Sequence, residues 1–294
     1  GGNVAVNALF IGKNDNVNGY LFQSGGSIVD RSGGNDNRIG GNDPEDVNGT
    51  GAYILSGGSL ETNTNLMIGG RGTGSFIQTG GTVNSTGGWT AIARYTEDGS
   101  RSTGLLELRA GTHNHSGGGQ GVLVAEEGDG VLEVRGTGVL NIANRLVVGG
   151  RDSNGELAPN QSGYGVVNLA TGGTIATGFV AQDSSNNGVP YGVFNFRRGT
   201  LKTNRSVNDF FQGLDEARIY SQGGTIDTNG FNIRIAQPLD NPSFDGVASI
   251  PVTNGGSGYL APPIVKISSA NSFDQGTGAT AVAVINEAST VTGI

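Results

Sequence analysis

Two glutamates at matching places in successive repeats are the strongest candidates for chemistry in this sequence. Glu107 stands three residues after the glycine of GLLEL, and Glu133 stands three residues after the glycine of GVLEV. Stacked repeats would bring their carboxylates to about 5 Å, close to the separation found in retaining glycosidases. However, Arg109 and Arg135 follow two residues later on the same strand face. We therefore expect a solvated charge ladder, with polysaccharide cleavage as the alternative.

The two histidines of the chain lie on one expected strand. His113 and His115 occur as THNH, and strand alternation points both to the same side. A metal ion could bind such a pair, but zinc sites use at least three protein ligands and no third is suggested. We expect a surface pair. Since the chain has no cysteine, disulfides and thiol chemistry are excluded.

For the chain as a whole we predict no catalytic residues, no cofactor and no enzyme activity.

Acidic turns could supply hard oxygen ligands for Ca²⁺. The stretch GGNDNRIGGNDPED (33–46) holds four weak candidates: Asp36, Asp43, Glu45 and Asp46. It lacks the regular nine-residue period of calcium-binding glycine-aspartate repeats. An ordinary Asn/Asp/Gly turn is the simpler interpretation, and the acidic turn at 126–129 is interpreted in the same way.

Aromatic residues near one expected loop could stack on sugars. Trp89 and Tyr95 flank this loop, although Trp89 is expected to begin a strand and to pack. Glycine-rich pieces such as GGRGTG (69–74) are interpreted as corners, since a phosphate loop would be followed by a helix.

Composition excludes several classes of partner. The 294 residues include 55 glycines and carry a formal charge of −8. Nucleic-acid binding needs clustered Lys and Arg, so no nucleic-acid partner is expected. No run of about 18 apolar residues exists, so no membrane span is expected. Val, Ile, Leu and Phe recur at regular intervals, unlike in disordered chains.

A repeat of strand, glycine corner and strand accounts for that regularity. It occurs eight times, at 19–30, 51–62, 74–85, 104–115, 130–142, 165–177, 192–203 and 217–228. A third strand precedes many of these units, at 8–12, 65–70, 121–125, 145–150 and 178–182. The loops of variable length all occur at one place in the repeat, between this preceding strand and the strand that opens the unit. Such periodicity, with insertions confined to one edge, is typical of solenoids.

Apolar residues recur two and four places after the residue that opens the second strand. They are Leu21, Tyr53, Leu55, Phe76, Leu106, Leu108, Leu132, Val134, Val167, Leu169, Phe194, Phe196 and Ile219. Side chains alternate across a strand, so these residues would stack into one core that no single repeat could bury alone. The pattern predicts an all-β parallel β-helix with three strands per coil and about eight or nine coils.

Two segments resemble known families. LMIGGRGTGSFIQTGGTVNSTG (66–87) resembles the autotransporter-associated β-strand repeats of giant bacterial surface proteins, and the resemblance covers about residues 1–235. It implies a right-handed parallel β-helix that serves as a stalk, adhesin or fibre, without shared catalytic residues. The tail, with NGGSGY (254–259) and GTGATAVAVI (276–285), looks like a small β module of bacterial surface and phage structural proteins. We divide the chain into a solenoid (1–236), a linker (237–246) and this module (247–294).

Both ends of the sequence suggest a piece of a longer protein or, alternatively, a subunit whose end completes the fold of the next one in a filament. The chain opens with the form of a corner followed by a third strand, and 291–294 aligns with 247–250, where the tail module begins. Phe22, Ile54 and Ile77 would form an apolar stripe on the outer surface, which is either an interface or covered by a loop of the same chain. With Val291 and Ile294 they are the candidate assembly residues.

The sequence thus predicts an extracellular or cell-surface structural protein of a bacterium. We expect a stalk or filament subunit that self-associates through the solenoid ends and the C-terminal module. The alternatives are a glycan-binding adhesin and a tailspike-like polysaccharide depolymerase.

Overall fold

The computed structural model describes the chain except residues 32, 42–47, 98–99, 118–120, 151–162, 183–189, 243–246, 248, 260, 266, 268–280 and 282. The described residues form two units, Gly1–Asn241 and Pro242–Ile294. Their regular structure is all β, and they contain no helix that could cross a bilayer. The boundary between the units falls inside the stretch expected to be a linker.

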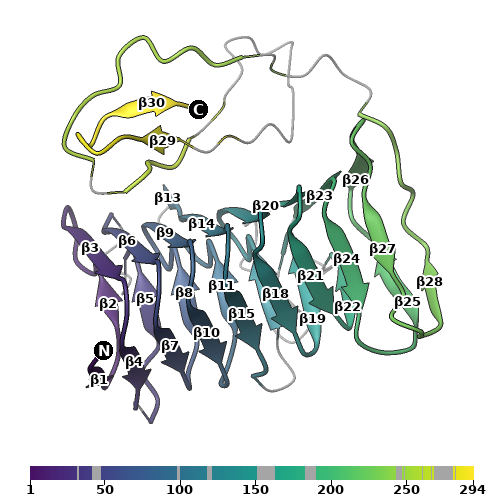
Figure 1. Ribbon diagram of the computed structural model, residues 1–294, viewed down its shortest axis with the longest axis horizontal. Coiled ribbons are helices and arrows are strands. Elements are labelled where there is room, and N and C mark those ends of the chain that lie inside the picture. The colour runs from purple at the N-terminus through teal and green to yellow at the C-terminus, as the bar shows by residue number, and fades with distance from the viewer. Residues whose placement is uncertain are drawn as a thin grey trace. The chain divides into compact units, whose positions relative to one another are not determined.

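The first unit is a parallel β-helix of three sheets (Figure 1). Sheet 1 contains β1 (Asn3–Val6), β4 (Ser27–Asp30), β7 (Ser59–Thr62), β10 (Thr82–Ser85), β15 (Thr112–His115), β18 (Val139–Ile142), β21 (Thr174–Thr177), β24 (Thr200–Thr203) and β27 (Thr225–Asp227). Sheet 2 contains β2 (Phe10–Ile11), β5 (Asn37–Ile39), β8 (Leu66–Ile68), β11 (Thr90–Ile92), β16 (Gly121–Val124), β19 (Arg145–Val148), β22 (Phe179–Ala181), β25 (Val207–Gln212) and β28 (Ile233–Ile235). Sheet 3 contains β3 (Asn18–Gln23), β6 (Thr50–Leu55), β9 (Thr73–Gln78), β14 (Thr103–Leu108), β17 (Asp129–Val134), β20 (Tyr164–Ala170), β23 (Tyr191–Arg197) and β26 (Glu216–Ile219).

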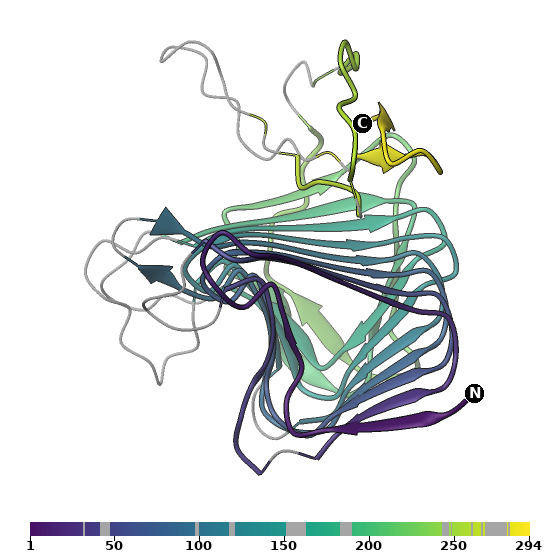
Figure 2. The same ribbon diagram turned by 90° about the vertical axis from the view of Figure 1, so that its left-hand side faces the viewer.

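Each coil visits sheet 2, then sheet 3, then sheet 1. Every strand pairs in parallel with the strand at the same place in the next coil, as where Leu106 of β14 pairs with Leu132 of β17. Viewed from the N-terminal end, the chain turns clockwise as it recedes, so the winding is right-handed (Figure 2). The sheets have nine, nine and eight strands in the described residues. The predicted fold class is therefore confirmed.

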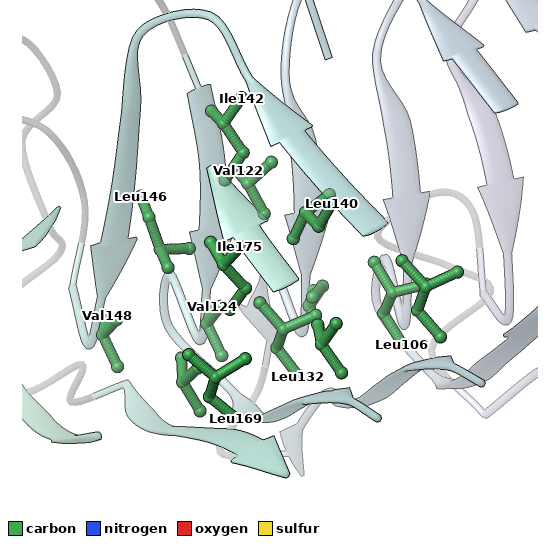
Figure 3. Close-up of a cluster of buried hydrophobic side chains, with 14 of the residues drawn as sticks. Leu106, Val122, Val124, Leu132, Leu140, Ile142, Leu146, Val148, Leu169 and Ile175 are labelled. Carbon is green, nitrogen blue, oxygen red and sulfur yellow. The ribbon is translucent and has the colours of Figure 1, made fainter. Parts of the chain in front are cut away.

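The core is the column of inward side chains that the apolar pattern predicted. Tyr53, Phe76, Leu106, Leu132 and their counterparts in later coils are fully buried. Side chains of all three sheets meet there, with Val122 and Leu146 from sheet 2, and Leu140 and Ile175 from sheet 1 (Figure 3). Each buried side chain of this size stabilises the fold by roughly 1.5–3 kcal/mol.

Two kinds of corner turn the chain. The corner from sheet 2 to sheet 3 has positive φ, between 58° and 80°, in six successive coils: Gly12, Gly40, Gly69, Ala93, Ala125 and Gly149. The expected Gly-Gly corner from sheet 3 to sheet 1 has positive φ at Gly26, Gly58, Gly81 and Gly111. The corners expected from the sequence in the later coils end at Gly138, Gly173, Gly199 and Gly224. The residue with positive φ comes one or two places earlier, at Gly136, Gly172, Arg198 and Gly223.

The described loops lie mainly between sheets 2 and 3, as expected. One of them carries an antiparallel pair, β12 (Thr96–Glu97) and β13 (Ser100–Arg101). The last coil extends past residue 236, where the linker was expected to begin. The Gln237 side chain accepts a hydrogen bond from the Leu214 amide (2.8 Å). The backbone of Asp240 forms an isolated parallel β-bridge with that of Arg218. Residues 237–240 therefore belong to the solenoid.

The second unit contains an antiparallel pair, β29 (Val284–Ile285) and β30 (Val291–Gly293). The NGGSGY segment packs on it, since the Val291 amide donates to the Gly255 carbonyl (3.0 Å) and the Tyr259 amide donates to the Ser289 carbonyl (3.1 Å). Gly256 and Gly258 have positive φ. Most of GTGATAVAVI lies outside the described residues.

Replacing a corner glycine tests this stacking. A Cβ on Gly69 would stand 2.2 Å from the Thr103 carbonyl oxygen, and φ is +71°. We expect Gly69→Ala to lower the free energy of unfolding by about 1–3 kcal/mol, as backbone strain does. Urea denaturation measures the change. Ala93→Gly, at the equivalent corner of the next coil, is the control and should stay within about 1 kcal/mol of wild type. Equal effects of both variants would contradict the packing described here.

Candidate assembly surface and polar clusters

Glu107 and Glu133 do lie side by side in register on the outer face of sheet 3. Arg109 holds Glu107 with two hydrogen bonds, Nε to Oε1 (2.6 Å) and Nη2 to Oε2 (2.7 Å). Arg135 adds Nη2 to Oε1 of Glu107 at 2.7 Å and lies 3.6 Å from Glu133. The structure thus contains the expected charge ladder, but the Glu107 side chain is 0% exposed rather than solvated.

Asparagines continue this ladder. Asn168 Nδ2 donates to Glu133 Oε2 (3.3 Å), and Asn195 Nδ2 donates to Asn168 Oδ1 (2.9 Å). Burial raises the pKa of Glu133, the charge of Glu107 raises it further, and Arg135 opposes both. A glycosidase nucleophile needs a carboxylate oxygen free to approach the sugar. Both Glu107 oxygens are engaged by arginine, so the geometry favours a structural role for this pair.

The histidines are not on the surface, so the expected surface pair is wrong. His113 is 0% exposed and His115 is 2% exposed, and both point into the core from β15. Burial lowers the pKa of His113 to about 3, with a further contribution from His115, and burial lowers the pKa of His115 to about 4. Both imidazoles are therefore neutral at neutral pH.

Trp89 and Tyr95 are occupied by arginines. The Arg94 guanidinium lies 5.7 Å from the Trp89 ring centre and 4.6 Å from that of Tyr95, and Arg71 lies 4.5 Å from Tyr95. Arg94 also pairs with the buried Glu126, Nε to Oε2 at 2.9 Å. Trp89 directly precedes β11 and packs against a small outer cluster, Ala91, Leu123 and Val147, as the sequence predicted. These contacts favour packing over sugar stacking.

The calcium candidates are only partly described. Asp36 pairs with Arg38 (3.3 Å) and accepts a hydrogen bond from Asn65 Nδ2 (2.7 Å). Asp43, Glu45 and Asp46 lie outside the described residues. In the part of the chain that is described, no group of three or more His, Asp and Glu residues is placed to hold a metal ion.

The expected apolar stripe exists, but only its N-terminal part is accessible. Phe22, Ile54 and Ile77 pair in register on the outer face of sheet 3. Phe22 is 54% exposed, Ile54 is half-buried and Ile77 is only 2% exposed, so Ile77 was wrongly expected on the surface. In the second unit Val291 is buried and Ile294 is exposed.

The N-terminal end of the solenoid extends this surface. Strands β1, β2 and β3 are the edge strands of the three sheets. Large apolar side chains are exposed on or beside them: Val4, Phe10, Val17, Tyr20 and Phe22. A hollow of about 350 Å³ opens there, lined by residues 1–2, 4 and 21–28. We call the edges of β1, β2 and β3, with these side chains, the N-terminal end surface.

Sequence reasoning missed most of this surface and one aromatic pair. Val4 occupies the inward row that Ile28 and Leu60 continue, and it is exposed because no described strand lies beyond β1. Tyr164 and Tyr191 stack in register, with ring centres 5.5 Å apart and planes 5° from parallel. The repeated tripeptide Tyr-Gly-Val was the signal for this pair. Tyr191 also donates to Glu216.

Comparisons of the chain with protein-family models, with curated proteins and with solved structures found no match.

Removing the central carboxylate tests the ladder. Glu107→Gln keeps the shape of the side chain but removes the negative charge between Arg109 and Arg135. We expect the free energy of unfolding to fall by about 1.5–3 kcal/mol, the range for hydrogen bonds to charged groups. Chemical denaturation at neutral pH measures the change. Glu61→Gln, an exposed glutamate on sheet 1, should have an effect close to zero. A neutral result for Glu107→Gln would show that the ladder adds no stability.

Proposed function

We propose that this chain is a structural segment of a bacterial surface stalk or extracellular filament, which assembles through the ends of its solenoid. The observation that carries the proposal is the N-terminal end surface, where exposed apolar side chains coincide with strand edges that have no partner among the described residues. Exposed β edges readily accept a further strand, and apolar patches of this kind commonly mark interfaces.

The cross-section of the solenoid supports end-to-end stacking. In the described residues β1, β2 and β3 each pair on one edge only, and so do β27 and β28 at the other end. At that end Ile226, Ile233 and Ile235 are only partly buried. At the C-terminal end Asp240 pairs with Arg218 of β26 and partly covers the edge of sheet 3, whereas β27 and β28 present unfinished apolar rows in the described residues. A second copy placed head to tail would continue each row with side chains of similar character.

The resemblance of 66–87 to autotransporter-associated repeats supports placing this role outside the cell, at a bacterial surface. In the same proposal the C-terminal unit, which resembles a module of surface and phage structural proteins, contributes a second attachment point through Ile294. The rod of stacked coils supplies length and stiffness. Neither property requires a catalytic residue.

A glycan-binding adhesin is the second candidate, and the Tyr164–Tyr191 pair favours it. The two tyrosines are the first residues of β20 and β23, directly after the variable loops. Tyr191 donates a hydrogen bond to the carboxylate of Glu216. Aromatic rings next to hydrogen-bonding groups are common in sugar sites. Binding to a glycan array that is lost in Tyr164→Ala would support this candidate, and an array without signal would oppose it.

Disrupting the N-terminal end surface tests assembly. Phe22→Glu places a charge on an exposed position of β3 and should leave folding intact. We expect self-association, measured by sedimentation over a range of concentrations, to weaken at least about tenfold, the effect of roughly 1.4 kcal/mol at an interface. Electron microscopy should show shorter fibres or none.

The control is Val139→Glu, which adds the same charge to a partly exposed position on the flank of the rod. It should assemble like the wild type. A wild-type chain that remains monomeric at high concentration, without ordered contacts, would refute the proposed function.

A further inference from the structure

The two histidines occupy an unusual place, inside the dry core of the solenoid. On β15, His113 lies between Val83 of β10 and Leu140 of β18, and His115 lies between Ser85 and Ile142 of the same strands. Both side chains are at least 98% buried. The same two rows hold apolar or hydroxyl side chains in the adjacent coils.

The imidazoles have few polar partners there. Thr90 Oγ1 lies 3.2 Å from His115 Nδ1, and the Phe76 ring meets His113 edge-on at 6.2 Å between ring centres. Both nitrogens of His113 and Nε2 of His115 lack a hydrogen-bond partner among the described residues. A neutral imidazole tolerates this environment at modest cost, whereas a cation does not.

Among the described residues that pair with or contact the two imidazoles, no charged group compensates for an imidazolium. These partners are Val83 and Ser85 of β10, Leu140 and Ile142 of β18, Phe76 of β9 and Thr90 of β11, and none of them is ionisable. In the row of His115, the carboxylate of Asp30 lies three strands away. Asp30 is also engaged by Asn37 and Thr64.

We propose that the coils around β15 are an acid-sensitive point of the solenoid, which opens when His113 and His115 take up protons. The direction follows from proton linkage. The folded-state pKa values of about 3 and about 4 lie below the usual value of 6.5. The stabilising effect of the neutral imidazoles is complete above pH 6.5 and is lost as the pH falls towards 4. Glu133, whose pKa is raised, acts in the opposite direction.

The decisive measurement is the unfolding equilibrium at several pH values between 6 and 4. Each buried histidine should raise the unfolding constant about tenfold per pH unit in this window. We therefore expect about a hundredfold change per unit from the pair in the wild type, and about tenfold from the remaining histidine in His113→Leu, which matches the flanking Leu140. Ser85→Ala changes a residue in the row of His115 that has no titratable group. This variant should keep the pH dependence of unfolding of the wild type.

Two further measurements keep the proposal falsifiable if a variant does not fold. The chain has only two histidines, so NMR titration of the folded wild type assigns their pKa values directly, and a pKa near 6.5 for either would overturn the proposal. Hydrogen exchange at pH 5 should accelerate first in β10, β15 and β18. Uniform acceleration along the solenoid would overturn local opening, and an unchanged pH dependence in His113→Leu would overturn the role of that histidine.

Discussion

The parallel pairing of each strand with its counterpart in the next coil is the constraint on which the rest of the structure depends. It places like positions about 4.8 Å apart along the axis, so the environment of a side chain is set by the same position in two neighbouring coils. Leu106, Leu132 and Val167 follow one another in this way, and the core is the sum of such rows. One residue of slippage would exchange the inner and outer faces.

The same rule governs the polar residues. On the outer face of sheet 1, Asn114 donates to Asn84 (3.0 Å) and Asn141 donates to Asn114 (2.9 Å). Inside, Gln78 Nε2 donates to the Gly81 and Thr112 carbonyls (both 3.1 Å). Polar groups are thus tolerated where a neighbouring coil supplies the matching partner. His113 stands out because the described residues of the neighbouring coils supply no hydrogen-bond partner for either of its ring nitrogens.

Stacking also explains why apolar side chains are exposed at the N-terminal end of the solenoid. Every inner coil has a neighbour on both sides, whereas β1, β2 and β3 have one on a single side in the described chain. The side chains that would be core residues in the middle of the rod, such as Val4, are therefore exposed there. Repetition along the axis thus creates the core and the N-terminal end surface by the same geometry, and the proposed role in assembly rests on this surface.

By itself the sequence determined the fold class, the three strands per coil, the inward apolar rows and the pairing of Glu107 with the arginines, because all of these follow from alternation along a strand and repetition between coils. It did not mark the inward face within THNH, which has no apolar residue, and that face could be read only from Val83 and Leu140 at the same place in the neighbouring repeats. Nor did it determine the burial of Ile77 or the end of the last coil at residues 237–240. Only the tertiary structure decided these, because burial depends on what packs against a residue from distant parts of the chain.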